Sequence, residues 1–225
     1  SLAGRVADIH YLIPKYKLQI HAEHFQIVRH NLLGIKGSKI TDIKTVRSHS
    51  QAIGQCQKII SANKLKSIVS ADTAGSAKFI SEKKDITEAA IASDLAAKIY
   101  NLEILKRNIE DELGNVTRFF IMGKESKHPE FKNKKYITSC IFKLKSIPAA
   151  LYKALGGFAT NGINLCRLES FAVKNTFDQV NFYIDIEGHI ENSSLQKALE
   201  ELGFHTQKLD ILGVYEAHQF RLKKL

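Results

Sequence analysis

Short apolar runs alternate with amphipathic stretches between Ile40 and Tyr100. In Gln51 to Ser61 the apolar residues recur at helical spacing, and Ser50 stands where an N-cap residue is expected. Two further helices are predicted to begin at Asp72-Thr73 and at Ser93-Asp94, where the first residue of each pair can cap the helix. This alternation of strands and helices is typical of an α/β fold. The strands predicted in this part are residues 45–47, 66–70, 88–92, 104–109 and 116–122.

Residues 136–225 follow a different order: strand, helix, strand, strand, helix, strand. Asn161-Gly162 and Gly203 stand at the predicted helix ends, where residues that tolerate a left-handed backbone are favoured. This order predicts a ferredoxin-like sandwich, with two helices on one face of an antiparallel sheet. The predicted elements are strand 136–143, helix 147–160, strands 163–173 and 179–187, helix 193–202 and strand 205–214.

The stretch between these two patterns is almost entirely polar. Residues 124–135 contain Lys, Glu, Ser, His, Pro and Asn with very few apolar side chains, which is typical of a linker or an exposed hairpin. The sequence therefore predicts two domains, residues 1–123 and residues 136–225, joined by a linker at 124–135.

Composition narrows the class of protein. A hydrophobic content of 44% over 225 residues is enough to form a packed core and argues against disorder. No apolar run approaches the roughly 20 residues of a membrane span, and the beginning of the chain lacks a signal-peptide pattern, so we expect a cytoplasmic protein. Cys56, Cys140 and Cys166 are far apart and are predicted to be buried thiols.

Positive charge is concentrated in the first part of the chain. The net charge is +10 overall, and residues 1–135 carry +9 of it. A positive surface attracts anions, so the candidates are nucleic acid, an anionic membrane or a small acidic substrate, beside the simpler interpretation that lysines serve solubility. Because the basic residues are scattered in ones and twos and do not cluster along one element, we expect no nucleic-acid partner.

Most common catalytic motifs are absent from the sequence. It contains no glycine-rich nucleotide loop and no nucleophile elbow. His21, His24 and His30 lie near a predicted extended segment, where residues three apart face opposite sides, so no metal site is expected. Thr117 and Arg118, at the start of an apolar strand, could place a proton donor beside a guanidinium.

Several segments resemble, in order and spacing, the motifs of the prephenate dehydratase family. The most specific is Asn115-Val116-Thr117-Arg118-Phe119. A second set of motifs resembles the phenylalanine-binding ACT domain of the same family, so the likeness covers almost the whole chain. The catalytic-part segments are Ser1-Leu2-Ala3-Gly4, Ser48-His49-Ser50-Gln51-Ala52, Asp72-Thr73-Ala74-Gly75-Ser76-Ala77 and Ala89-Ala90-Ile91-Ala92, and the ACT segments are Ile147-Pro148-Ala149-Ala150-Leu151, Asn161-Gly162-Ile163-Asn164-Leu165 and Leu168-Glu169-Ser170.

The resemblance implies a cofactor-free lyase that converts prephenate to phenylpyruvate, with loss of water and carbon dioxide, in phenylalanine biosynthesis. It places Thr117 at the catalytic position, where its hydroxyl would act on the leaving group. It assigns Arg118 to a substrate carboxylate or to organising the site. The residues that it implies for substrate binding are Ser1, Ser48, Gln51, Thr73, Ala74, Gly75 and Phe119.

The resemblance also implies a fold: a two-lobe α/β catalytic domain like that of periplasmic binding proteins, followed by a βαββαβ ACT domain. Because the chain begins at Ser1, we expect the first lobe to lack its first strands, and we expect this chain to be weak or inactive as a catalyst on its own. The alternatives are an ACT-type amino-acid sensor without catalysis and a two-lobe solute-binding protein.

The ACT segments imply an L-phenylalanine effector and association through paired ACT domains, as a homodimer or homotetramer. Two segments depart from the family pattern: Phe171-Ala172 replaces Arg-Pro, and Pro148 is followed by Ala149 in place of Gly. These changes put the affinity for phenylalanine in question. The residues implied for the effector are Ala149, Ala150, Leu151, Asn161, Gly162, Ile163, Asn164, Leu165, Glu169 and Ser170.

Overall fold

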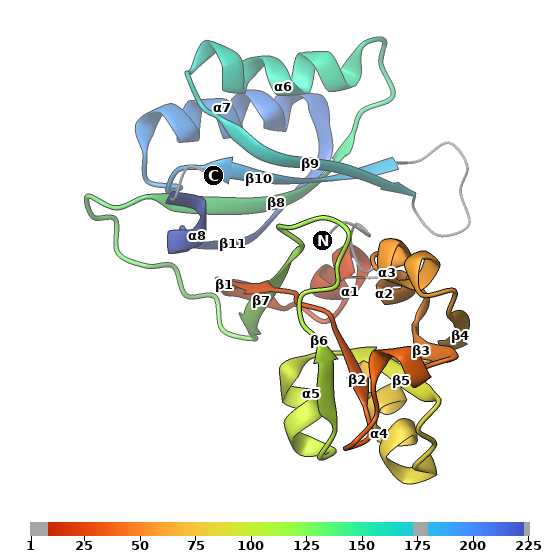
Figure 1. Ribbon diagram of the computed structural model, residues 1–225. Coiled ribbons are helices and arrows are strands. Elements are labelled where there is room, and N and C mark those ends of the chain that lie inside the picture. Colours follow the sequence, from red (N-terminus) through yellow and green to blue (C-terminus); the bar gives the residue numbers. More distant parts are fainter. Residues whose placement is uncertain (1–8, 173–179, 223–225) are drawn as a thin grey trace. The chain divides into compact units, whose positions relative to one another are not determined.

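The computed structural model describes residues 9–172 and 180–222, which form two compact units (Figure 1). The first unit is residues 26–117, and the second combines residues 9–25 with residues 118–222. Strands β1 (Gln19–Ile27) and β7 (Val116–Gly123) pair with each other, and each passes from one unit to the other. Among the described helices, none has the length and apolarity that a membrane span needs.

The first unit is built on a five-stranded sheet in the order β4-β3-β5-β2-β6. Strand β3 runs parallel to both β4 and β5, whereas β2 runs antiparallel to β5 and β6. This mixed α/β unit agrees with the alternation predicted from the sequence. The strands are β2 (Asn31–Gly34), β3 (Thr45–His49), β4 (Lys66–Ser70), β5 (Glu88–Ala92) and β6 (Glu103–Lys106).

Helices cover both faces of this sheet because neighbouring residues of its central strands point to opposite sides. Leu32 and Ile91 pack with α2 (Ser50–Gly54) and α3 (Gln57–Ala62), whereas Leu33 and Ala90 pack with α4 (Thr73–Lys83) and α5 (Asp94–Ile99). All of β5 is buried, and its four apolar residues include three alanines, which lets the helices lie close.

Two predicted caps are confirmed and one is wrong. The Asp72 carboxylate accepts a hydrogen bond from the Gly75 amide at 2.6 Å, and the Ser93 hydroxyl accepts one from the Ala96 amide at 3.2 Å. The predicted helix 51–61 is divided in two, and its N-cap is His49, not Ser50. The second half is a separate helix, α3, because the Asp111 carboxylate accepts hydrogen bonds from its first two backbone amides, those of Gln57 and Lys58.

The second unit contains a four-stranded antiparallel sheet in the order β11-β8-β10-β9. Helices α6 (Ala150–Thr160) and α7 (Ser193–His205) cover one face through a cluster around Phe142 and Phe158, so the predicted ferredoxin-like order is confirmed. Helix α6 begins later than predicted because Ala149 adopts a left-handed backbone, with φ of 56°. The strands are β8 (Tyr136–Leu144), β9 (Leu165–Ala172), β10 (Val180–Glu187) and β11 (Thr206–Glu216).

The opposite face of this sheet is covered by the N-terminal segment, which the sequence did not predict. Helix α1 (Ile9–Lys15) and strand β1 contribute Ile13 and Ile20 to a buried cluster with Ile141 and Leu212. A side chain at Gly213 would bring its Cβ within 2.1 Å of the Ile20 carbonyl oxygen, so this glycine lets β1 lie directly on β11. Two short elements, η1 (Ile40–Asp42) and α8 (Gln219–Leu222), complete the described part.

The predicted linker at 124–135 contains neither helix nor strand. The Tyr136 hydroxyl holds its end by donating to the Glu130 carbonyl at 2.9 Å and accepting from the Lys132 amide at 3.0 Å. The domain boundaries at 1–123, 124–135 and 136–225 stay a prediction, since residues 118–123 associate with the second unit.

Candidate functional site

A hollow of about 280 Å³ lies in the first unit, where β3 and β4 end and where α2 and α4 begin. In α/β sheets this edge, at the carboxyl ends of parallel strands, is where ligands bind. It is lined by Val28, His30, His49, Gln51, Ala52, Gln55, Asp72, Thr73, Asn115 and Thr117.

Three residues that the resemblance implied meet in this hollow, although they are distant in sequence. Gln51 comes from the first turn of α2, Thr73 begins α4, and Thr117 lies on β7. The structure therefore brings the predicted catalytic residue together with two predicted substrate contacts.

Other predicted residues lie around the hollow without lining it. Ser48 is fully buried and donates its hydroxyl hydrogen to the Ile91 carbonyl at 2.7 Å, so it supports the floor. Ala74 and Gly75 form the first turn of α4, where the Gly75 amide is used by the Asp72 cap. Phe119 is half-exposed on β7, and Ser1 lies outside the described residues.

A polar group that the sequence alone did not reveal belongs to this hollow. The side-chain oxygen of Gln55 lies 2.9 Å from His30 Nε2 and 2.9 Å from Asn115 Nδ2. With this oxygen as the acceptor, Nε2 of His30 carries its proton. His30 and Asn115 are both buried. In the sequence, the only hint of this group was that Asn115 stands two residues before Thr117.

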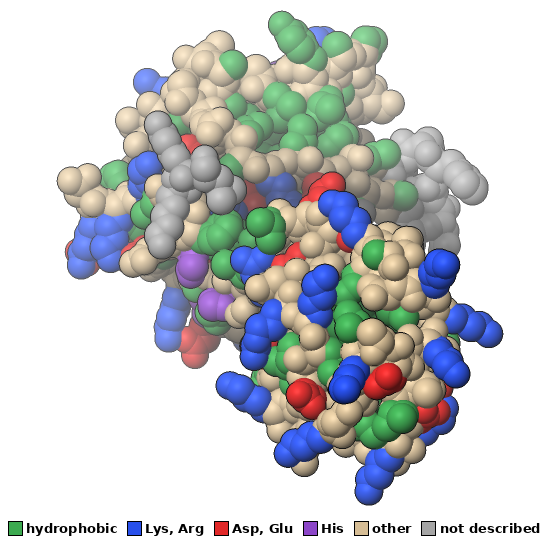
Figure 2. Space-filling model, in the orientation of Figure 1, with side chains coloured by type: hydrophobic (Ala, Val, Ile, Leu, Met, Phe, Trp, Pro, Cys, Tyr) green, Lys and Arg blue, Asp and Glu red, His purple; other side chains and the backbone are tan. Residues whose placement is uncertain are grey.

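The hollow suits an anion without a cationic contact. Within its described lining there is no Lys or Arg side chain. The polar groups are amides, hydroxyls, the imidazoles of His30 and His49, and the Asp72 carboxylate, one oxygen of which accepts from the Gly75 amide. Helix α4 begins there, and its free amides favour negative charge. Figure 2 shows Lys and Arg side chains scattered over the visible face of residues 26–117, where they raise the potential without forming a single patch.

Arg118, the next residue along β7, does not line this hollow, and successive side chains of a strand face opposite sides. Its guanidinium is nearly buried in the second unit, with Nε 2.7 Å from a Glu23 carboxylate oxygen and Nη1 paired with Asp185. Nη2 donates to the Tyr215 hydroxyl at 2.6 Å. Burial alone would lower the pKa of Arg118, but Asp185 raises it above its usual value, so the charge is permanent.

The residues predicted for the effector divide between the two faces of the four-stranded sheet. Leu151, Ile163 and Leu165 pack together on the face that α6 and α7 cover. Glu169, by contrast, pairs with Tyr183 across the sheet and points to the other face, where its carboxylate lies 3.0 Å from His10 Nε2.

Most of the other residues predicted for the effector lie at the two ends of α6. Ala149 is its N-cap and Ala150 its first residue. Asn161 ends the helix and donates its amide to the Gly157 carbonyl and to Glu201, and Gly162 follows with φ of 66°. Asn164 accepts the amide of Glu187 with its carbonyl, and Ser170 pairs with Phe182 across the sheet.

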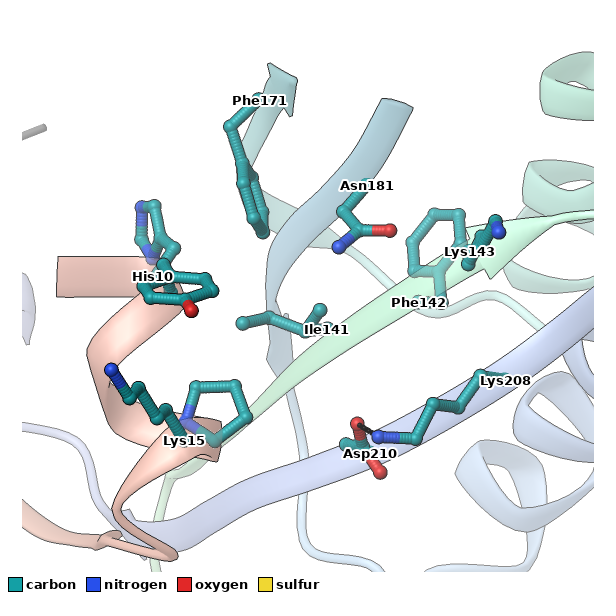
Figure 3. Close-up of a pocket in the computed structure, with 11 residues that line it drawn as sticks. His10, Lys15, Ile141, Phe142, Lys143, Phe171, Asn181, Lys208 and Asp210 are labelled. Atoms are coloured by element: carbon teal, nitrogen blue, oxygen red, sulfur yellow. Dashed lines mark ion pairs between the residues drawn. The ribbon is translucent and has the colours of Figure 1, made fainter. Parts of the chain in front are cut away.

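A second cavity, of about 360 Å³, opens on the Glu169 face of the sheet (Figure 3). Its walls come from α1 and from all four strands, and the side chain of Phe171 points toward it. Phe171 is one of the residues at which the chain departs from the family pattern, so this departure alters the lining of the cavity. The other labelled residues are His10, Lys15, Ile141, Phe142, Lys143, Asn181, Lys208 and Asp210.

Comparison with known proteins agrees with this geometry. The family described as prephenate dehydratase matches residues 1–127. A bifunctional N-acyl-homoserine lactone acylase/prephenate dehydratase of Komagataeibacter europaeus is 44% identical, over 99% of this chain and 79% of that protein. A prephenate dehydratase of Methanocaldococcus jannaschii is 39% identical, over 96% and 78%. The crystal structure of prephenate dehydratase from Arthrobacter aurescens in complex with L-Phe is 27% identical with a TM-score of 0.82, over 93% and 71%.

Proposed function

The chain belongs to the prephenate dehydratase family, whose members are carbon–oxygen lyases, and on this premise we propose that it converts prephenate to phenylpyruvate in phenylalanine biosynthesis. The observation that carries the proposal is the convergence of Thr117, Thr73 and Gln51 in one hollow at the carboxyl edge of the parallel strands. Its volume of about 280 Å³ suits a small dicarboxylate.

The chemistry needs little from the protein beyond position and one proton. The bond between the ring and its carboxylate breaks, carbon dioxide leaves, and the electron pair enters the ring. The ring hydroxyl then departs as water after accepting a proton, and the aromatic product drives the reaction. In this proposal the Thr117 hydroxyl hydrogen-bonds the departing oxygen as general acid, and the start of α4 together with the His30–Gln55–Asn115 group binds the carboxylates.

Replacing Thr117 with Ala tests this role. We expect turnover to fall about 100-fold or more, in the range of a lost general acid, with KM nearly unchanged. Phenylpyruvate formation is followed by ultraviolet absorbance. Thr41→Ala, an exposed threonine of the same unit, is the matched control and should retain full activity. Normal turnover by Thr117→Ala would remove Thr117 from the acid role.

We further propose that L-phenylalanine regulates the reaction through residues 136–222, and that the protein acts as a homodimer or homotetramer. The support is the ferredoxin-like order of this part and the phenylalanine bound by the Arthrobacter relative. The contacts proposed are Ala149 to Leu151, Asn161 to Leu165 and Ser170. Glu169 lies on the same strand as Ser170, but its side chain faces α1, so we propose that it acts on effector binding indirectly, through β9.

The alternative function is a sensor without catalysis. It differs from the regulated lyase in two measurements, the Tm with phenylalanine and the formation of phenylpyruvate. A sensor shows a rise in Tm with phenylalanine but no phenylpyruvate formation. The regulated lyase shows both, and turnover falls as phenylalanine is added. Sedimentation velocity with and without phenylalanine reports the oligomeric state.

A further inference from the structure

Thr117 and Arg118 are neighbours on β7, yet their side chains belong to different units. Thr117 lines the hollow of residues 26–117, and Arg118 is held inside the second unit. The peptide that joins them is part of a paired strand, so a movement of Arg118 along the strand is transmitted to Thr117. The contacts that hold the Arg118 side chain therefore influence the position of Thr117, the proposed acid.

Arg118 is held on every side of its guanidinium. Glu23 pairs with Nε, Asp185 pairs with Nη1, and the Tyr215 hydroxyl accepts from Nη2. The ring of Phe120 lies against the guanidinium, 4.5 Å from the carbon atom to its centroid. A buried pair of this kind is costly to break, because either charge alone would be left in a dry environment. The side chain must follow Asp185 if Asp185 moves.

Asp185 belongs to the proposed regulatory sheet. It lies on β10, is fully buried, and accepts hydrogen bonds from the hydroxyls of Ser139 and Tyr183. Across the sheet it pairs with Arg167 on β9, the strand that also carries Glu169 and Ser170. Asp185 thus connects the strand of the proposed effector contacts to the strand of Thr117.

We propose that Arg118 is a positioning residue, held by Asp185 and Glu23, through which the four-stranded sheet sets the position of Thr117. Phenylalanine bound to this sheet changes turnover by moving Asp185 and, with it, β7. This inference rests on the proposed function, and it adds the physical link between effector and acid. Arg118 does not itself touch the substrate in this arrangement.

Arg221 provides a matched control for Arg118. It also pairs with Glu23, at 2.6 and 3.0 Å, and lies 3.7 Å from Asp185, but it comes from α8 and not from β7. Arg118→Lys and Arg221→Lys each keep the charge and lose the planar fork that makes several contacts at once. Both should lower Tm by a similar amount. Only Arg118→Lys should affect Thr117.

The test measures kcat, KM and phenylalanine inhibition in both variants. For Arg118→Lys we expect kcat to fall about 10-fold with KM changed less than twofold, and the inhibiting concentration of phenylalanine to rise about 10-fold, within the usual size of allosteric coupling. Arg221→Lys should keep wild-type values. Equal effects in both variants, or full inhibition in Arg118→Lys, would overturn the proposal.

Hydrogen exchange separates failure of this link from failure of the proposed function, because it needs no turnover. Phenylalanine should alter exchange at the amides of 116–120 in the wild type, and Asp185→Asn should abolish that change while phenylalanine still raises Tm. If Asp185→Asn does not fold, Tyr215→Phe removes a single contact of Arg118 and should halve the response or more. An unaltered response in these variants, or no response in the wild type, would rule the link out.

Discussion

The carboxylate of Glu169 on β9 is contacted by His10 of α1 and by Arg167 of the same strand. Burial tends to raise its pKa, but hydrogen bonds from Arg167 and His10 outweigh burial and hold the pKa below its usual value of 4.5. His10 is stacked on Tyr183, with ring centroids 4.2 Å apart, so the imidazole is fixed in place. The sequence motif predicts Glu169 as an effector contact, which stays a prediction, and the structure shows that its carboxylate also joins α1 to the sheet through His10.

The lowered pKa of Glu169 predicts how stability depends on pH. A group with a lowered folded pKa contributes stability above its unfolded pKa, and loses that contribution as pH falls through the folded pKa. We therefore expect wild type to exceed Glu169→Gln in unfolding free energy at pH 6, and the two to converge below pH 4.5. Urea denaturation at several pH values measures this. A constant difference down to pH 3 would contradict the assignment.

Among the elements, α4 is one of two helices whose start lines the proposed substrate hollow. Its N-cap, Asp72, is held to the Gly75 amide at 2.6 Å, and the two residues are only three apart in sequence. We expect Asp72→Ala to cost about 1 kcal/mol of unfolding free energy, which lowers Tm by roughly 2–4 °C for a protein of this size. Asp72→Asn keeps an oxygen acceptor and should stay within about 0.5 kcal/mol of the wild type. Calorimetry of the three proteins provides the comparison, and equal losses in both variants would show that charge, not capping, matters.

The same comparison shows what could be predicted from the sequence at this scale. Asp72 and Ser93 were predictable because each N-cap oxygen accepts a hydrogen bond from an amide only three residues further along the chain. The break between α2 and α3 was not, because its cause is Asp111, more than 50 residues away. Thr117 was found by resemblance, whereas His30 and Gln55 became visible only when the fold brought them to Asn115.

For the whole molecule, the two patterns of secondary structure and their order were predictable from hydrophobic periodicity alone. The association of residues 9–25 and 118–123 with the four-stranded sheet was not. It depends on Ile13, Ile20 and Arg118 meeting residues of β8, β10 and β11 far along the chain, and no local signal reports such contacts. Gly213 accommodates that packing, because a side chain there would meet the Ile20 carbonyl oxygen.

The distribution of charge leads to a last prediction, on substrate binding. Residues 1–135 carry a net charge of +9, yet the described lining of the hollow contains no Lys or Arg, so the attraction for a dianion acts over a distance. Long-range attraction is screened by salt, with a Debye length of about 30 Å at 0.01 M and about 8 Å at 0.15 M. We expect KM for prephenate to rise several-fold between these salt concentrations while kcat stays constant, since the field affects capture and not the chemical step. Steady-state assays at matched pH measure this, with sucrose at equal osmolality as the control. A KM that does not respond to salt would mean that local amide and hydroxyl donors alone bind the substrate.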